Sequence, residues 1–414
     1  MPQLPVLIIG AGVAGLSAAS HLRAAGIEYL IVEASARIGG RARTVMLGSD
    51  AFDLGASWLH DAARNPLVAL AREDHATIID SDAVRTRRVL IGQTPATASE
   101  LANRAAAWER FDQTASAAPR DIALASAIDS LRADPWTASI EAWEACQIAA
   151  ADPRDFSVVD WRINALEGQN LALQGGIGAF VERSLGRRAG PVHLGVPVRA
   201  IDWRDGITAK TDHGSIKASA CIVTVSTAAL SRIALTPSLP ISTEGLPMGT
   251  LTKIALRASG AERLGLRPDE SVTARIERDE PMMSCIAWPG GADHAVIFIG
   301  GPPAQALSRE GEAATLDFVR TRLRHWFGNT ADKAFGETIV SNWSEDEWHG
   351  GSYAYARPGH AGDRAILGAP LADGRLIIAG EATATDGLAG TVAGAWNEGK
   401  RAAATVQAAL SRRA

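Results

Sequence analysis

Apolar residues near the start of the chain form two short continuous runs with an amphipathic segment between them. Residues 6–9 and 29–32 are uninterrupted apolar runs, as expected for strands buried on both faces of a parallel sheet. The segment between them repeats apolar residues at helical spacing, at Leu16, Ala19 and Leu22. Gly26 then suits the left-handed position that ends many helices. The pattern predicts a strand, a tight glycine turn, a helix and a second strand over residues 5–33.

The hydrophobic pattern changes along the rest of the chain. Residues 81–170 are rich in Ala, Arg, Glu and Trp at helical spacings, which predicts several helices of a second domain. Strand-like runs return at 196–201, 207–211, 222–225, 251–300 and 375–379. Helical patterns cover residues 312–327 and 391–410. Both chain ends and a middle piece therefore form one domain, into which the other domain is inserted.

Composition narrows the class of protein. A chain of 414 residues with 47% apolar and 21% charged residues suits two globular domains. A net charge of −5 gives no reason to expect nucleic acid or an anionic membrane as partner. The three cysteines stand far apart, so neither a disulfide framework nor a metal site is expected. Without a basic leader or an apolar stretch of membrane length, a reducing cytoplasm is the compartment that fits.

The first chemical signal is a glycine motif placed between strand and helix. Gly10, Gly12 and Gly15 form G-x-G-x-x-G, and Glu33 follows at the end of the second predicted strand. These glycines allow a tight turn, close approach of the backbone to a pyrophosphate and close packing of helix on strand. A plain glycine turn is the alternative interpretation. The motif predicts a dinucleotide site and does not by itself separate NAD from FAD.

A second glycine turn follows Glu33 and carries arginines. Gly39 and Gly40 let the backbone pass close to a ligand, while Arg37 and Arg41 supply fixed positive charge for phosphate oxygens. A solvated basic turn is the alternative interpretation. Because an NAD site needs no second turn of this kind to bind phosphate, the two motifs together favour FAD.

The run E-A-S-A-R-I-G-G-R-A-R-T over residues 33–44 resembles the signature of the flavin amine oxidase family, which includes monoamine oxidases, polyamine oxidases, histone lysine demethylases and L-amino-acid oxidases. Further stretches resemble family segments in the same order, at residues 52–66, 248–253, 343–359 and 379–395. The resemblance implies an α/β fold: a discontinuous Rossmann-like FAD-binding domain with an inserted α+β substrate domain. The FAD-binding parts are then residues 1–80, 172–236 and 365–414. The substrate domain has a helical part at 81–171 and a sheet part at 237–364.

The resemblance also assigns roles in cofactor binding. It places Glu33 at the adenosine ribose, Arg41 and Arg37 at the pyrophosphate, and Val198 at the adenine. It places Gly380 and Glu381 at the ribityl–phosphate part of FAD. Thr391 and Val392 then present the N-terminus of the last helix to the flavin N1–C2=O edge, where negative charge develops on reduction. Ser352 stands where some monoamine oxidases have a flavin-linked cysteine, so we expect non-covalent FAD.

Four residues are candidates for catalysis. Lys253 can hold a water near flavin N5 and favour reduction of O2 by its charge; a surface lysine is the alternative. Tyr353 and Trp343 can form aromatic walls that keep the substrate amine neutral, and core aromatics are the alternative. His60 can contact substrate or be a hydrogen-bonded histidine at a helix start.

These residues predict oxidation of an amine to an imine, with hydride transfer to flavin N5, hydrolysis of the imine to an aldehyde, and H2O2 from O2. A polyamine-type substrate is slightly favoured, because Thr391 replaces the second tyrosine of the monoamine oxidases. Asp61 and Glu167 are candidates to meet a distal ammonium. The partners are a small amine and O2, and the oligomeric state stays open, a homodimer included.

Several alternatives remain at this point. One alternative is an aromatic or aliphatic monoamine oxidase, which differs from a polyamine oxidase only in the shape of its substrate site. An L-amino-acid oxidase needs an arginine for the substrate carboxylate, and arginines are too numerous in this chain to choose one. A desaturase of C–C bonds is disfavoured by Lys253 and by the segment 351–353. A flavin-binding protein without catalysis is the alternative outside the enzymes.

Overall fold

The sheet that carries the glycine turn gathers its strands from three separate parts of the chain. In the computed structural model, which describes residues 4–412, this sheet is parallel throughout, in the order β19-β12-β1-β2. Its strands are β1 (Val6–Ile9), β2 (Tyr29–Val32), β12 (Ala220–Val223) and β19 (Leu376–Ile378). The predicted strands at 6–9 and 29–32 are confirmed, whereas the strand expected at 222–225 begins two residues earlier.

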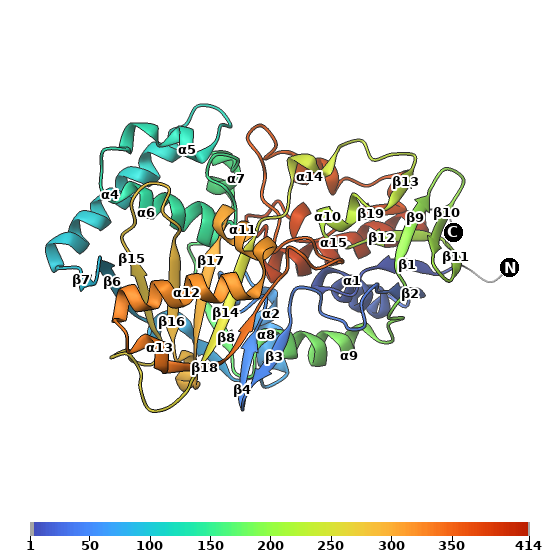
Figure 1. Cartoon of the computed structure of the whole chain (residues 1–414). Coiled ribbons are helices and arrows are strands. Elements are labelled where there is room, and N and C mark those ends of the chain that lie inside the picture. The colour runs from blue at the N-terminus through green and yellow to red at the C-terminus, as the bar shows by residue number, and fades with distance from the viewer. Residues whose placement is uncertain (1–3, 413–414) are drawn as a thin grey trace.

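Helices from the two chain ends pack together beside this sheet. These are α1 (Val13–Ala24) and α15 (Val392–Ser411). Their backbones approach so closely that a Cβ added at Gly399 would lie 2.1 Å from the carbonyl oxygen of Ala14. Figure 1 shows the start of β1 and the C-terminal end of α15 at the same end of the molecule. The close contact explains how the first and last segments of the chain form one domain.

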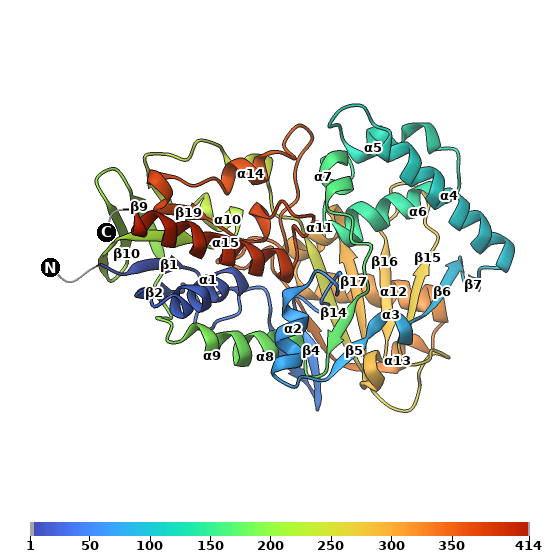
Figure 2. The same ribbon diagram turned by 180° about the vertical axis from the view of Figure 1, so that it is seen from behind.

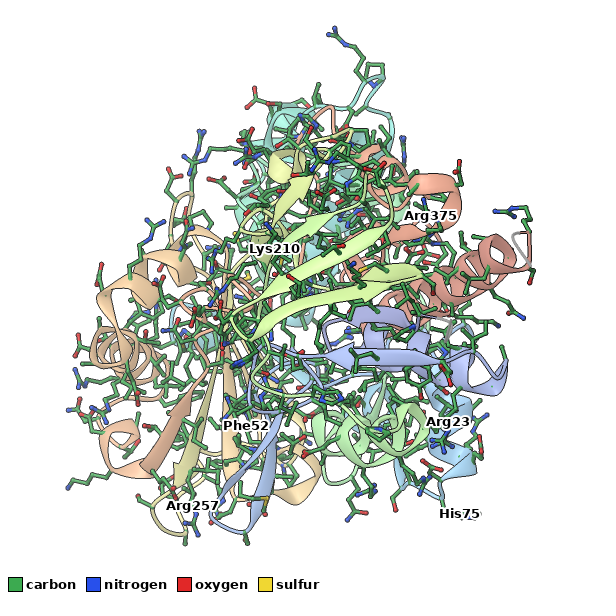
Figure 3. All side chains as sticks on the ribbon, turned by 90° about the vertical axis from the view of Figure 1, so that its right-hand side faces the viewer. Arg23, Phe52, His75, Lys210, Arg257 and Arg375 are labelled. Carbon is green, nitrogen blue, oxygen red and sulfur yellow. The ribbon has the colours of Figure 1, made fainter. Side chains whose placement is uncertain are left out.

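A smaller sheet lies at the outer end of the same domain, in the order β11-β10-β9-β13. Figure 3 faces this end of the molecule and labels Lys210 on β10. The strands are β9 (Val198–Asp202), β10 (Ile207–Thr211), β11 (Gly214–Ala218) and β13 (Ala234–Thr236). The predicted strand at 207–211 is confirmed. Strand β11 was not predicted, because its glycine, serine and lysine residues give a weak strand pattern.

The second domain is built on a seven-stranded sheet in the order β18-β14-β17-β16-β15-β6-β7. Its strands are β6 (Thr86–Ile91), β7 (Thr94–Pro95), β14 (Leu251–Ala258), β15 (Glu270–Ala274), β16 (Met283–Ala287), β17 (His294–Gly300) and β18 (Phe335–Val340). The predicted helical part at 81–171 contains helices, but it also contains strand β6, which the sequence pattern did not predict. This strand is extended because it pairs in parallel with β15, nearly two hundred residues away in sequence.

The two faces of the seven-stranded sheet have different neighbours. One face packs on α11 (Pro302–Glu310) and α12 (Glu312–Phe327) through Val272, Ile297 and Ile299. The predicted helix at 312–327 is therefore confirmed. Because side chains alternate along a strand, the adjacent residues point to the opposite face. There Ser271, Thr273 and Phe298 line a large cavity.

A layer of helices covers the cavity side of this sheet, as Figure 2 shows from behind. It contains α4 (Ala98–Ser116), α5 (Leu124–Ala127), α6 (Thr137–Glu141), the π-helical segment η2 (Ala142–Ile148) and α7 (Val158–Ile163). The longest of these, α4, begins with a capping box formed by Thr97 and Glu100. No helix within residues 4–412 is both long and apolar enough to cross a membrane.

Candidate active site

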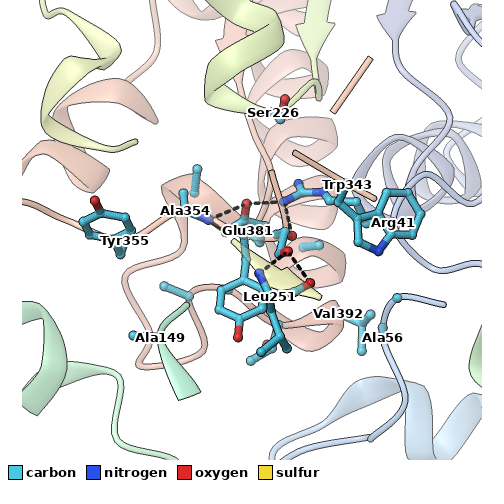
Figure 4. A pocket seen from close by; sticks show the side chains of 18 of the residues that line it. Arg41, Ala56, Ala149, Ser226, Leu251, Trp343, Ala354, Tyr355, Glu381 and Val392 are labelled. Atoms are coloured by element: carbon cyan, nitrogen blue, oxygen red, sulfur yellow. Dashed lines mark hydrogen bonds and ion pairs between the residues drawn. The ribbon is translucent and has the colours of Figure 1, made fainter. Parts of the chain in front are cut away.

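A cavity of about 1370 Å³ runs from the glycine turn after β1 to the space under the helical layer. Residues of both domains line it, so the site forms only when the two domains are assembled. Figure 4 shows part of it, with Arg41, Glu381 and Trp343 close together. Of the residues singled out by sequence analysis for catalysis or FAD binding, all but Gly15 and Arg37 line this cavity.

The glycine turn has the geometry that a bound dinucleotide requires. Gly10 has φ of 101°, and a Cβ added at Gly15 would lie 1.9 Å from the Gly10 oxygen. Gly15 therefore allows helix α1 to pack on the turn. Within the described chain no side chain caps α1 at Gly12, which leaves the first-turn amides open to an anion. A Cβ added at Gly40 would lie 3.2 Å from Cα of Gly12, so the two glycine turns touch.

Glu33 is held in place by backbone amides at the end of β2. Its carboxylate accepts hydrogen bonds from the amides of Ala11 at 2.7 Å and Ser35 at 2.8 Å. The segment leading to Val198 is attached beside it, because the Val196 amide donates to the Glu33 carbonyl at 2.9 Å. The carboxylate and Val198 thus line the same end of the cavity.

The structure separates the two arginines of the second glycine turn. Arg37 lies outside the cavity lining, and its guanidinium donates to the carbonyls of Ile38 at 3.1 Å and Gly40 at 2.6 Å. Arg37 has no position in the lining, and its expected contact with the pyrophosphate stays a prediction. Its contacts are with its own loop, whose backbone conformation it stabilises.

Arg41 instead reaches across the cavity to Glu381. Its Nη1 donates to Glu381 Oε1 at 2.8 Å and to the Ser352 carbonyl at 2.9 Å. Glu381 also accepts a hydrogen bond from the Ala354 amide at 3.2 Å (Figure 4). The preceding residue, Gly380, has φ of 155°, which favours glycine there. This network joins three distant chain segments on one wall.

The N-terminus of α15 also opens into the cavity. Thr391 is its N-cap residue: the hydroxyl oxygen accepts from the Gly394 amide at 3.0 Å and donates to the Leu388 carbonyl at 2.7 Å. Val392 is the first residue of the helix and lines the cavity. The positive end of the helix dipole therefore faces the cavity, while Thr391 satisfies one of the first-turn amides.

Lys253 is buried on β14, and its ammonium has its partners at the end of strand β4 (Asp50–Asp53) and in the loop that follows it. Its Nζ donates to the carbonyl oxygens of Asp53 and Gly55 and to the hydroxyl of Ser57. The ammonium also lies 5.2 Å from the ring centre of Phe52. Burial lowers the pKa of Lys253 to about 8. The group is therefore a desolvated cation whose charge is sensitive to pH just above neutrality.

The two predicted aromatic residues line the cavity and are hydrogen-bonded to the chain. The Tyr353 hydroxyl donates to the Ile148 carbonyl at 2.8 Å, and burial raises the pKa of Tyr353, so the phenol stays neutral. Its ring lies beside Gly390, where an added Cβ would be 3.5 Å from Cδ2. Trp343 Nε1 donates to the Leu54 carbonyl at 3.1 Å. Both rings therefore have fixed positions.

His60 is a hydrogen-bonded histidine in the cavity wall, and its contact with substrate stays a prediction. It lines the cavity, and its Nδ1 lies 2.7 Å from Asn170 Oδ1. The Asn170 amide group donates to Asp82, so its oxygen is the atom left for His60 and Nδ1 carries the proton. Burial lowers the pKa of His60. The ring is therefore neutral near pH 7 and presents Nε2 as an acceptor.

The two expected acidic residues differ in position. Asp61 is buried and forms an ion pair with Arg64, whose Nε lies 2.7 Å from Asp61 Oδ2. Its side chain does not line the cavity. Glu167 does line the cavity.

Asp112 and Glu144, which the sequence patterns did not single out, line the cavity with Glu167. We call Asp112, Glu144 and Glu167 the acidic group. Glu144 lies in the π-helical segment η2 and accepts a hydrogen bond from Trp161 Nε1 at 2.9 Å. Burial raises the pKa of Glu144 to about 7, and burial with the nearby charge of Glu167 raises that of Asp112. The spacing of Trp108 and Asp112 places both on one face of α4, and this was the sequence signal that could have identified Asp112 as a residue of the site.

Comparison with known proteins agrees with this geometry. A model of flavin containing amine oxidoreductases matches residues 13–120 and 124–407. Lysine-specific histone demethylase 1 homolog 1 of Oryza sativa subsp. japonica is 26% identical, covering 100% of this chain and 54% of that protein. The chain thus spans about half the length of that relative. Polyamine oxidase 4 of the same species is 25% identical, covering 96% of this chain and 87% of that protein.

Solved structures show the same fold. A triple mutant of putrescine oxidase superposes with a TM-score of 0.81 at 21% identity, covering 98% of this chain and 99% of the other. The family model covers most of the chain and includes Glu33, Lys253 and Glu381. The chain therefore belongs to the flavin-containing amine oxidoreductase family.

Proposed function

We propose that this chain is a FAD-dependent oxidase of amines. The observation that carries the proposal is one continuous cavity, which joins the dinucleotide turn at Gly10 and Gly12 to the pocket around Lys253, Trp343 and Tyr353. The residues present fit FAD: an open helix N-terminus suits the pyrophosphate, and Glu33 suits the ribose. Arg41 fits the pyrophosphate and Glu381 the ribityl–phosphate region, with Val198 at the adenine.

FAD, when bound, would supply the acceptor for a hydride from the carbon beside the amine nitrogen and the route by which the electrons reach O2. Water would hydrolyse the imine product to an aldehyde independently of the O2 step. The chain's own residues create the conditions for this. Tyr353 and Trp343 exclude water and favour the neutral amine, which has the free lone pair that the reaction needs. The N-terminus of α15, at Thr391 and Val392, stabilises negative charge on a group bound against it. Lys253 supplies positive charge for the O2 step.

The cofactor is expected to be bound tightly but not covalently. Ser352 occupies the position of the linking cysteine, and its hydroxyl is engaged with Leu251, accepting from the amide at 2.8 Å and donating to the carbonyl at 3.1 Å. Purified protein should be yellow, and precipitation with acid should release the flavin into the supernatant. Flavin that stays in the pellet contradicts the prediction of non-covalent binding. A protein that takes up NAD but not FAD contradicts the assignment of FAD as the cofactor.

An anaerobic screen tests the activity itself. Amines and amino acids are added to the FAD-loaded protein without O2, and loss of the oxidised flavin absorbance is recorded. Bleaching by at least one amine, followed by release of H2O2 when air is admitted, is expected. A flavin that no compound bleaches would instead fit a flavin-binding protein without catalysis.

For the substrate we propose an extended amine of polyamine type. The acidic group lines the cavity under the helical layer, where a second ammonium of the substrate can be bound. In this partly desolvated position a charge pair is stronger than in water. Aromatic monoamines such as benzylamine lack the second charge. If kcat/KM for these aromatic monoamines is at least tenfold higher than for spermidine and putrescine, the proposal of a polyamine-type substrate is wrong. The chain would then be a monoamine oxidase.

The ionisation of Glu144 gives a pH-dependent test. With a pKa raised to about 7, Glu144 is neutral at pH 6 and anionic at pH 8. The ratio of kcat/KM for putrescine to that for butylamine should therefore rise about tenfold between these pH values, equivalent to ~1.4 kcal/mol. Because both substrates carry a reacting amine, the ratio of their kcat/KM values removes the effect of pH on that nitrogen.

Glu144→Gln should abolish this rise, because glutamine keeps an acceptor for Trp161 but carries no charge. Glu109→Gln removes an exposed carboxylate from α4 and is the matched control. A ratio that rises equally in the wild type and in Glu144→Gln excludes Glu144 as the distal site.

A further inference from the structure

The segment that leads into α15 is a turn over residues 386–390, directly before the N-cap residue Thr391. Ala389 and Gly390 of this turn line the cavity. Gly387 and Gly390 have φ of 79° and 74°, so the backbone takes conformations there that favour glycine. The position of this turn therefore determines where the N-terminus of α15 lies.

Two side chains hold the start of the turn, at Asp386. Asn397 of α15 donates from Nδ2 to the Asp386 carboxylate at 2.9 Å. Arg64 donates from Nη1 to the Asp386 carbonyl at 2.9 Å. Both contacts act at the beginning of the turn, four residues before the helix begins to be capped.

The end of the turn is held from the other domain. Asn164 is the C-cap residue of α7 and lines the cavity. Its Oδ1 accepts a hydrogen bond from the Ala389 amide at 3.2 Å, across 225 residues of sequence. Figures 1 and 2 both show α7 at the edge of the helical layer nearest to the domain that contains α1 and α15. The helical layer thus holds the chain two residues before Thr391.

The Asn164 side chain is itself fixed in orientation. Its Nδ2 donates to the Asp160 carbonyl at 3.0 Å and to Asp160 Oδ1 at 2.9 Å. With the amide nitrogen used in this way, Oδ1 is the atom that faces the turn. Asp160 is in turn paired with the buried Arg364. Asn164 is therefore a fixed acceptor, connected to a buried ion pair.

Backbone packing leaves the turn little room to move. A Cβ added at Gly387 would lie 3.0 Å from the carbonyl oxygen of Ile163 in α7. A Cβ added at Gly394 would lie 2.2 Å from the Leu388 carbonyl oxygen, so the first turn of α15 packs directly on residues 386–390. A displacement of the turn is therefore transmitted to the start of α15.

We propose that Asn164 is a positioning residue that helps to set the reduction potential of the bound flavin. It acts through the Ala389 amide, which keeps the N-terminus of α15 in place. A helix N-terminus stabilises negative charge on a group bound against it, and a flavin gains negative charge on reduction. The inference rests on the proposed binding of FAD, and it gives the helical layer a role in the properties of the cofactor.

Asn164→Ala removes the acceptor and should lower the potential of the flavin. We expect a roughly three- to tenfold shift of the equilibrium toward oxidised flavin, which corresponds to about 15–30 mV for two electrons. The potential is measured against a reference dye with a chemical reductant, so no amine substrate is needed. Asn103→Ala removes an exposed asparagine from α4 and is the matched control, expected to keep the wild-type potential.

Hydrogen–deuterium exchange tests the structural step separately. Amides of residues 388–394 should exchange faster in Asn164→Ala than in the wild type or in Asn103→Ala. Asn397→Ala loosens the start of the same turn and should shift the potential in the same direction. It is the second variant, which decides the question if Asn164→Ala does not fold.

The outcomes separate this inference from the proposed function. A shift below 1.5-fold, about 5 mV, in FAD-loaded Asn164→Ala overturns the inference, and so does unchanged exchange at residues 388–394. If only Asn397→Ala folds, an unchanged potential in that variant overturns it. A wild type that binds no FAD overturns the cofactor assignment and this inference with it. A wild type that binds FAD but oxidises no amine overturns only the oxidase activity.

Discussion

Replacement of Lys253 by methionine is expected to slow the reaction of reduced flavin with O2 by roughly 10²-fold or more. Methionine has a similar length but supplies neither the charge nor the donors that meet Asp53, Gly55 and Ser57. The ammonium is buried, so its charge is screened less than that of a surface lysine. Flavin reduction by the amine should change much less, because that step does not build up negative charge on oxygen.

Stopped-flow mixing of the reduced enzyme with O2 measures this step directly. Because burial lowers the pKa of Lys253 to about 8, the cationic form disappears as the pH rises through that value. Reoxidation of the wild type should therefore slow from pH 7 to pH 9, whereas the Lys253→Met rate should be low and independent of pH. Lys253→Arg keeps the charge and should recover part of the rate. Equal reoxidation rates in the wild type and Lys253→Met, with normal FAD content, contradict the assignment.

Loss of the buried ion pair between Arg364 and Asp160 should reduce the free energy of unfolding by about 3–5 kcal/mol. The pair is bidentate: Arg364 Nε and Nη2 each lie 2.8 Å from an Asp160 oxygen. Arg364 also donates to the carbonyls of Ala354 and Ala382 at 3.0 Å each, on either side of Glu381 in the fold. Arg364→Met leaves a buried carboxylate without its cation, so both stability and FAD retention should fall.

Urea denaturation with parallel measurement of bound flavin tests this prediction. Arg154→Met breaks the exposed pair with Asp152 and is the matched control, expected to cost at most about 1 kcal/mol. The double variant Asp160→Leu with Arg364→Met should lose less than the sum of the two single changes, because it removes both buried charges. An Arg364→Met protein within 1 kcal/mol of the wild type would refute the role given to this pair.

The parts of the fold that sequence predicted well depend on local chemistry. The turn at Gly10 and Gly15 needs glycine because a Cβ would meet nearby backbone or side-chain atoms, and this requirement is visible in the residue types alone. The helix at 312–327 was predicted with its observed bounds, since one apolar face repeats at helical spacing. Ordered motifs also brought Lys253, Tyr353 and Glu381 into one expected site. The substrate end of that site carried no comparable motif.

Only the tertiary structure decided what the individual charged residues of the cavity region do. Arg37 and Arg41 are the same residue type four positions apart, yet one contacts its own loop and the other pairs with Glu381, 340 residues away in sequence. Arg87 and Arg88 are adjacent, but β6 turns one to the cavity and the other to Glu270. The physical reason is that the energy of a charge depends on its desolvation and on its nearest opposite charge. Both are set by long-range packing, which residue order alone does not specify.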